Sequence, residues 1–363
     1  MNTEEIKTAL KTKSSKATKK VDLLSTGSTL LNLACSGNPG GGYPGGGYIF
    51  FVGDSMSGKT WYSLTCMAEA VLDKKFKDHR FIYDNVERGA MMDFPRYFGQ
   101  TMADKIEAPA SDKDGNPVNS SFIEEFYFHL DDALCDGRPF IYVLDSMDSL
   151  DAFADDDKFA ERKKAFEDGK DTKGSYGMAK ASANSTTIRT IPGRLAETGS
   201  ILIIISQTRD NVDPRNPFQT KTRAGGRALR FYATVEIWSS LAGKIKKTYK
   251  GKERQIGVNV KLQVQKSRLT GKGCEVIVPI FYSMGIDDIG SCIDYLVAEK
   301  EWSKAKNGMI TAIGIGPEQS MKREKLIEYV EENGLIEDVR DLVGAVWKKI
   351  EEATAVKRKQ KYK

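Results

Sequence analysis

Cysteine pairs at metal-binding spacing are absent from this 363-residue chain. Its five cysteines are scattered and odd in number, which argues against a disulfide framework and favours reduced thiols. The two histidines, His79 and His129, stand far apart, so we expect no zinc site. The chain also has no apolar run of ~18 residues, the length that crosses a membrane, and no apolar secretory signal. These absences predict a soluble, cytoplasmic protein without a membrane partner.

The remaining composition is that of a globular protein with unevenly placed positive charge. Hydrophobic residues make up 40% of the chain and charged residues 29%, enough for one large domain and a smaller one. The net charge is only +5, yet lysines crowd the first twenty residues. The last eight residues, "VKRKQKYK", hold five basic residues and no acid. Such ends are commonly just solvated, and a polyanionic partner is the alternative.

Short apolar runs alternate with helical patterns through most of the chain. Near-continuous apolar runs predict strands that are covered on both faces, as in a parallel sheet flanked by helices. These runs are residues 48–52, 81–83, 140–145 and 200–206. Helical patterns lie between them, at 60–72 and 122–134, and this order predicts an α/β fold with a mainly parallel sheet.

The later part of the chain has a different pattern. Residues 228–238, 257–268 and 274–282 alternate apolar and polar side chains, which predicts antiparallel edge strands. Two long polar or basic segments, 151–184 and 209–226, fit neither pattern, and loops of that length are commonly functional. We divide the chain into a basic N-terminal segment, an α/β core and a small α-rich C-terminal domain with a basic tail. Their bounds are 1–25, 26–289 and 290–363.

A phosphate-binding motif follows the first apolar run. "GDSMSGKT", residues 53–60, matches GxxxxGK[ST] between a predicted strand and a predicted helix, which is the context that the motif requires. Its backbone N–H groups and the helix N-terminus would hold phosphate oxygens of ATP. Lys59 would reach the β- and γ-phosphates, and the Thr60 hydroxyl would bind Mg²⁺. The predicted nucleotide-binding residues are Gly53, Asp54, Ser55, Met56, Ser57, Gly58, Lys59 and Thr60.

Three polar residues follow other predicted strands. Asp145 ends the run 140–145, where a second acidic residue would orient Mg²⁺. Gln207 ends the next run and is a candidate sensor of the γ-phosphate. Glu87, shortly after the run 81–83, is a candidate base that polarises the attacking water; a solvated loop carboxylate is the alternative.

The second long segment has the charge of a nucleic-acid contact. Between residues 209 and 230, six basic and two acidic side chains leave a net charge of +4, which predicts salt-dependent and largely sequence-independent phosphate binding. Glycines there would allow a close backbone approach. In the first segment, Tyr176 and Met178 are candidates to wedge between bases. The candidate contacts in the second are Arg209, Arg223, Gly225, Gly226, Arg227 and Arg230.

Taken in order, these motifs resemble the RecA recombinase family, including its phage UvsX-type members. "LLSTGSTLLNLAC" is similar to the family's lead-in before the phosphate loop, and "LDSMDSL" to its magnesium strand. "IISQTR" resembles its glutamine-switch strand, and "VQKSR" a later basic strand end. "GGRALRFYATVEIW" is the most specific match, since it resembles the second DNA-binding loop running into a strand.

The resemblance implies a RecA-like core and an ATP-dependent filament on single-stranded DNA that exchanges strands with a homologous duplex. It implies that Lys266 and Arg268, which we place at the end of an edge strand, reach a neighbouring subunit's ATP. It also places residues 174–178 in the first DNA loop. The family's glutamate stands two residues after an aspartate, whereas Glu87 stands three after Asp84, so either carboxylate is a candidate base.

Two other functions share part of these features. A ring-forming motor such as a replicative helicase would have the same phosphate loop and sheet, but no reason for "GGRALRFYA" after the glutamine strand. A DNA-binding mediator would bind ATP and hydrolyse it poorly, which the unusual position of Glu87 allows. We rank the recombinase first.

Overall fold

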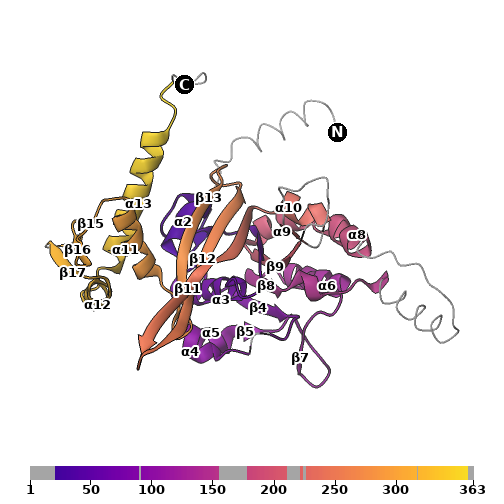
Figure 1. Ribbon diagram of the computed structural model, residues 1–363. Coiled ribbons are helices and arrows are strands. Elements are labelled where there is room, and N and C mark those ends of the chain that lie inside the picture. The colour runs from indigo at the N-terminus through magenta and orange to yellow at the C-terminus, as the bar shows by residue number, and fades with distance from the viewer. Residues whose placement is uncertain are drawn as a thin grey trace.

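A ten-stranded sheet forms the centre of the protein in a computed structural model (Figure 1). The structure describes residues 21–89, 91–154, 178–210, 221–223, 226–316 and 318–358. The strand order is β14-β13-β12-β11-β3-β9-β8-β4-β5, and β10 pairs with β9. The strands are β3 (Tyr48–Gly53), β4 (Arg80–Asn85), β5 (Ile106–Glu107), β8 (Phe140–Asp145), β9 (Ile201–Asp210), β10 (Lys221–Arg223), β11 (Val235–Tyr249), β12 (Lys252–Ser267), β13 (Cys274–Phe281) and β14 (Gly285–Ile286).

The parallel half of the sheet confirms the prediction from the apolar runs. Strands β3, β9, β8, β4 and β5 pair in parallel, and all six residues of β3 and of β8 are buried. Successive side chains of a strand point to opposite faces, so one apolar run supplies two cores. Phe51 and Ile203 face one core, and Phe50 and Ile204 face the other.

Helices cover both faces of this half. On one face, Leu64 and Met67 of α3 (Lys59–Leu72) pack in the same core as Phe51, together with α2 (Thr29–Ser36). On the other, α6 (Ile123–Cys135) and α9 (Ile191–Thr198) contribute Phe126 and Leu195 to the core around Phe50. The observed fold is therefore the predicted α/β class, with helices close to the predicted 60–72 and 122–134.

The antiparallel half departs from the prediction at its start. Residues 228–232, expected to be strand, belong to helix α10 (Gly226–Tyr232). Leu229 and Ala233, four residues apart, are both buried, while Arg230 and Phe231 between them are exposed, which is a helical spacing. β11 then pairs in parallel with β3 and antiparallel with β12, so it is not an edge strand. β12 lies between β11 and β13 and is not an edge strand either.

The C-terminal part combines helices with a three-stranded sheet, β15-β16-β17. Its elements are α11 (Asp288–Ala298), β15 (Ser303–Lys304), β16 (Met309–Ala312), β17 (Gln319–Lys322), α12 (Arg323–Glu332) and α13 (Ile336–Thr354). Leu326 and Val343 belong to the same apolar core as the central strands, so this part packs continuously onto the sheet. The boundary at 290 stays a prediction; that residue lies in the first turn of α11.

Several smaller elements complete the described chain. Two pairs of short strands, β1 with β2 and β6 with β7, lie outside the main sheet. These and the remaining helices are β1 (Leu23–Leu24), β2 (Tyr43–Pro44), β6 (Ala110–Ser111), β7 (Pro117–Val118), α4 (Phe94–Phe98), α5 (Gln100–Lys105), a 3₁₀ turn (Met147–Ser149) and α8 (Met178–Thr187). The predicted long segment 151–184 thus ends in a helix. No helix among the described residues has the length and apolar character needed to cross a bilayer.

Candidate active site

The predicted phosphate loop connects β3 to α3 at the carboxyl end of the parallel strands. Gly58 precedes the helix with φ of 82°, a left-handed conformation that favours glycine. At Gly53 an added Cβ would meet the Ser239 hydroxyl oxygen at 2.0 Å, so no larger residue fits there. Glycine is therefore needed at Gly53 for space and favoured at Gly58 for backbone conformation, in agreement with the motif.

Lys59 is held at the centre of the loop. Its side chain is buried, and its Nζ donates hydrogen bonds to the carbonyl oxygens of Gly53 at 3.0 Å and Asp54 at 2.7 Å. Burial lowers the pKa of Lys59, although nearby carboxylates, Asp145 and Glu87 first among them, act in the opposite direction. A cation placed among backbone carbonyls can turn to phosphate oxygens, which are stronger acceptors.

Thr60 and Asp145 lie in direct contact. The Thr60 hydroxyl donates to Asp145 Oδ2 at 2.7 Å, and the Tyr83 hydroxyl donates to the same oxygen at 3.0 Å. A hydroxyl and a carboxylate are the hard oxygen ligands that Mg²⁺ prefers, so this pair fits the predicted ion. The described residues contain no group of three or more His, Cys, Asp or Glu side chains suited to a metal. An ion here would therefore need oxygens from a nucleotide or from water.

The two candidate carboxylates have different surroundings. Asp84 is fully buried and accepts hydrogen bonds from Ser120 N at 2.9 Å, Ser120 Oγ at 2.6 Å and the Tyr142 hydroxyl at 2.9 Å. Glu87 is exposed and lines the same cavity as Lys59. Its Oε1 accepts hydrogen bonds from Ser146, Ser149 and Gln207. The geometry favours Glu87 as the carboxylate that water can reach.

Gln207 lies beside Glu87. We predicted from the sequence that it ends its strand, and this is wrong. β9 continues to Asp210 because it pairs with β10 beyond the apolar run. The Gln207 amide Nε2 donates to Glu87 Oε1 at 2.9 Å, and its backbone N donates to Asp148 Oδ2 at 2.6 Å. The glutamine thus connects the strand that leads toward the basic segment with the cavity of the phosphate loop.

Together these residues surround a cavity of about 200 Å³. It is lined by Ser55, Met56, Lys59, Thr60, Asn85, Glu87, Gly89, Met92, Asp145 and Gln207. The phosphate loop, helix α3, the ends of β4 and β8, and Gln207 within β9 contribute to it, since the carboxyl ends of parallel strands meet at one edge of the sheet. The structure thus brings together the predicted phosphate, magnesium, base and sensor residues.

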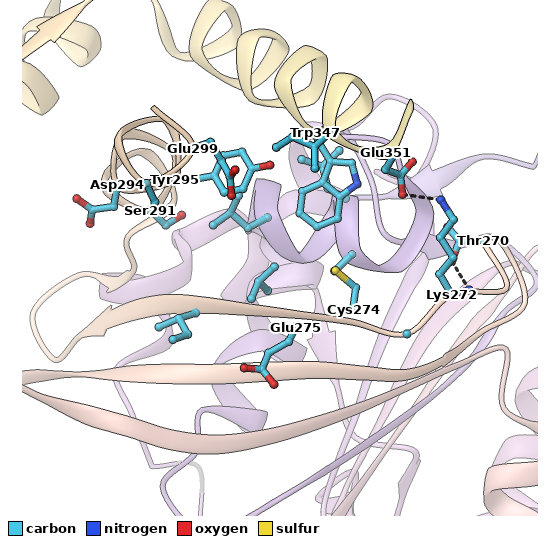
Figure 2. A pocket seen from close by; sticks show the side chains of 18 of the residues that line it. Thr270, Lys272, Cys274, Glu275, Ser291, Asp294, Tyr295, Glu299, Trp347 and Glu351 are labelled. Carbon is cyan, nitrogen blue, oxygen red and sulfur yellow. Dashed lines mark hydrogen bonds and ion pairs between the residues drawn. The ribbon is translucent and has the colours of Figure 1, made fainter. Parts of the chain in front are cut away.

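A larger cavity of about 780 Å³ lies elsewhere, between β13, α2, α11 and α13 (Figure 2). Apolar side chains and the rings of Tyr295 and Trp347 form much of its wall, and a Lys272–Glu351 ion pair of 2.8 Å stands at its side. It contains neither a phosphate loop nor the Thr60–Asp145 pair. Its size alone would make it the candidate nucleotide site, but the cation and the oxygen ligands that a magnesium-bound triphosphate needs line the smaller cavity.

Lys266 and Arg268 do not enter the nucleotide cavity of their own chain. The Lys266 ammonium donates to the carbonyls of Arg230 at 2.9 Å and Phe231 at 2.8 Å, and Arg268 Nη2 donates to the Phe231 carbonyl at 2.8 Å. Both cations therefore bind the last turn of α10, where a helix presents free carbonyls and partial negative charge. Burial lowers the pKa of Lys266, and the neighbouring Arg268 adds to this effect.

The predicted DNA contacts are only partly within the described residues. Tyr176 and Gly225 lie outside them, and the described part of Met178 and of Arg223 is the backbone, in α8 and β10. Arg209 lies 3.6 Å from Asp148. Gly226, Arg227 and Arg230 belong to α10 rather than to a loop, and Arg230 Nε lies 2.9 Å from a carboxylate oxygen of the buried Glu236.

Comparison with known proteins finds similar sequences. A family model described as the RecA N-terminal domain matches residues 148–287, from the end of the Asp145 strand to the start of α11. The chain is 27% identical over 319 residues to proteins named Protein RecA from Streptococcus pneumoniae, among them strains Hungary19A-6 and CGSP14. The aligned region covers 85% of this chain and 72% of each relative. These matches support a relationship to the RecA-type recombinase family.

One basic surface of this protein was missed in the sequence. Between Lys244 and Ile256, toward its turn, the β11–β12 hairpin pairs with no other strand among the described residues. This part projects past the rest of the sheet (Figure 1). Residues 244–254 of this ribbon hold six cations and one acid, a net charge of +5. Its basic side chains are all exposed: Lys244, Lys246, Lys247, Lys250, Lys252 and Arg254. The basic run "KIKKTYKGKER" could have identified this surface from the sequence.

Proposed function

We propose that this chain is a DNA-dependent ATPase that forms filaments on single-stranded DNA and pairs that strand with a homologous duplex. The single observation that carries the proposal is the cavity that joins Lys59, Thr60, Asp145, Glu87 and Gln207. Gln207 lies on the strand that runs toward the basic segment, so the same element adjoins both the nucleotide site and the proposed DNA contact. Similarity to RecA proteins supports this function, and we expect it to operate in the cytoplasm.

The phosphate loop would bind the β- and γ-phosphates of ATP through Lys59 and the backbone N–H groups before α3. Thr60 and Asp145 would hold Mg²⁺, which supplies charge stabilisation to the phosphates when it is bound. Gln207 would sense the γ-phosphate; the hydrogen bond from its amide to Glu87 in the cavity supports this role.

Glu87 would act as the general base. An attacking water forms a bond to the γ-phosphorus while the bond from that phosphorus to the bridging oxygen of ADP breaks. The water proton passes to the Glu87 carboxylate, whose exposed position lets water reach it. Three hydrogen-bond donors, Ser146, Ser149 and Gln207, orient this carboxylate. Its place in the cavity, despite the unusual spacing from Asp84, supports turnover over a non-hydrolysing mediator.

Completion of the site between subunits is part of the proposal. Lys266 and Arg268, at the end of β12, lie outside the cavity of their own chain and donate to carbonyls of α10, so they are available to a neighbour's nucleotide only if they leave the Arg230 and Phe231 carbonyls. A cation supplied in trans accelerates phosphoryl transfer by roughly 10³-fold or more. Their substitution should therefore slow DNA-stimulated hydrolysis without removing nucleotide binding.

Two basic regions would contact DNA. The first is the segment from Arg209 to Arg230, which we assign to the single strand. The second is the β11–β12 ribbon, residues 244–254, which we assign to the duplex because its charge is exposed and a two-stranded ribbon fits a major groove. Neither contact requires sequence recognition, since backbone phosphates supply the binding energy.

The first test is ATP hydrolysis with and without single-stranded DNA, with Lys59→Ala as the comparison. We expect strong stimulation by DNA in the wild type and a loss of ~10²-fold or more in the variant, because the cation that holds the transferred phosphate is gone. ATP-dependent DNA binding without hydrolysis would instead support the mediator. Unwinding of a forked duplex in the absence of a homologous partner would support a ring-forming motor.

A further inference from the structure

Three consecutive residues of β9 bind three different segments of the nucleotide site. Gln207 donates to Glu87, Thr208 Oγ1 donates to Asp54 of the phosphate loop, and Arg209 lies 3.6 Å from Asp148. Side chains of a strand alternate between its faces, so this strand end reaches segments on both sides of it. The contacts of Gln207 with Glu87 and Asp148 are described above, but those of the Asp54 side chain are not.

Asp54 is also bound by the strand that pairs with β9. The Lys221 ammonium, at the first position of β10, contacts both carboxylate oxygens of Asp54. Lys221 pairs in register with Asp210, and Thr208 with Arg223, so both ligands of Asp54 come from two paired strands, β9 and β10. Burial alone would raise the pKa of Asp54, but the hydrogen bonds from Lys221 and Thr208 hold it below its usual value.

A carboxylate within a phosphate loop is an electrostatic problem for ATP. Asp54 lies between Gly53 and Ser55, and its backbone carbonyl accepts a hydrogen bond from Lys59 Nζ at 2.7 Å. Its negative charge is therefore close to the place where triphosphate oxygens would bind, and like charges repel. Lys221 and Thr208 offset that charge without entering the cavity, which they do not line.

We propose that Lys221 is a positioning residue for ATP binding: its ion pair with Asp54, completed by Thr208, neutralises the phosphate loop and links ATP affinity to the pairing of β9 with β10. This inference rests on the proposed nucleotide site. Linkage is reciprocal. A ligand that binds better when β9 and β10 are paired in this way therefore strengthens ATP binding by the same factor as ATP strengthens the binding of that ligand.

The test is a double-mutant cycle with fluorescent N-methylanthraniloyl ATP as the probe, using the full chain. Lys221→Met should weaken ATP binding by roughly tenfold, within the range typical of coupling between sites, because Asp54 is left unpaired. Asp54→Asn in the Lys221→Met background should restore most of that loss. The loss should also be smaller for the corresponding AMP analogue, which carries less charge; a general loss of packing would affect both nucleotides alike.

Lys325→Met is the matched control, because Lys325 is likewise an exposed lysine in an ion pair, with Glu328 on α12. If Lys221→Met does not fold, as judged by circular dichroism, Thr208→Val removes the second donor and should weaken ATP binding more modestly. The inference is overturned if Lys221→Met and Thr208→Val bind ATP as the wild type does while Lys59→Ala has lost binding. If Lys59→Ala also binds like the wild type, the proposed nucleotide site itself is wrong, and the inference fails with it.

Discussion

The two halves of the central sheet differ in how their charged side chains are paired. At the carboxyl end of the parallel half, each of three charged groups of the cavity is hydrogen-bonded to a neutral polar group: Lys59 to loop carbonyls, Asp145 to Thr60 and Glu87 to Gln207. In the antiparallel half, the ribbon 244–254 holds six exposed cations, of which Lys246 pairs with Glu253. The other five have no acidic partner among the residues that the structure describes.

This difference fits the two kinds of binding that we propose for one sheet. Phosphoryl transfer needs reacting groups held in a defined geometry, which buried parallel strands provide because their ends converge. Binding to a DNA backbone needs charge rather than geometry, and flexible exposed lysines provide it through counterion release. Substitutions in the first region should therefore change rates, and substitutions in the second should change affinity and its salt dependence.

Glu87→Gln should give the largest effect. The amide keeps the size of the side chain but cannot take a proton, so we expect DNA-stimulated hydrolysis to fall by about 10²–10⁴-fold while ATP binding is retained. Steady-state hydrolysis and nucleotide binding are measured on the same preparation. Glu107→Gln, at a carboxylate that pairs with Arg80 on the sheet edge, is the control. Normal turnover in Glu87→Gln would remove Glu87 as the base.

Neutralising the ribbon should give an intermediate effect. We expect Lys247→Ser, Lys250→Ser and Lys252→Ser together to weaken duplex binding and to reduce the slope of log K against log salt by up to ~0.9 for each lost phosphate contact. ATP hydrolysis without DNA should not change, because the ribbon is far along β11 from the cavity. Serine at Lys74, Lys75 and Lys77, exposed lysines after α3, makes the charge-matched control. Equal salt slopes in the two triple variants would contradict the assignment of the ribbon to duplex DNA.

Asp84→Asn should give the smallest effect and a characteristic pH dependence. Burial raises the pKa of Asp84, while hydrogen bonds from Ser120 and Tyr142 act against this. The folded protein therefore binds this proton more tightly than the unfolded chain, so the group's contribution favours folding at low pH and is lost as the pH rises through its raised pKa.

Relative to the wild type, Asp84→Asn should gain stability between acid and neutral pH, by about 1 kcal/mol, since the hydroxyls around it can accept as well as donate hydrogen bonds. Urea unfolding at several pH values measures this. A difference between the two proteins that is independent of pH would mean that Asp84 titrates no differently in the folded and unfolded states.

Much of the fold follows from the sequence because burial leaves a local signature. The run 140–145 coincides with β8, and the helix expected at 60–72 is α3, one residue longer at its start. The error at 228–232 has a physical reason as well. A short amphipathic stretch suits both periods, and only the packing of Leu229 and Ala233 on one side decides for the helix.

By itself, the sequence determined the phosphate loop, the order of strands and helices, and the identity of Lys59, Thr60, Asp145 and Gln207 as a set. Each of these depends on neighbours along the chain. Only the tertiary structure decided which carboxylate faces the cavity, that Lys266 binds α10, and that Asp54 pairs with Lys221, 167 residues away. Such contacts depend on strand register and on which face a side chain occupies, and these are set when the sheet assembles.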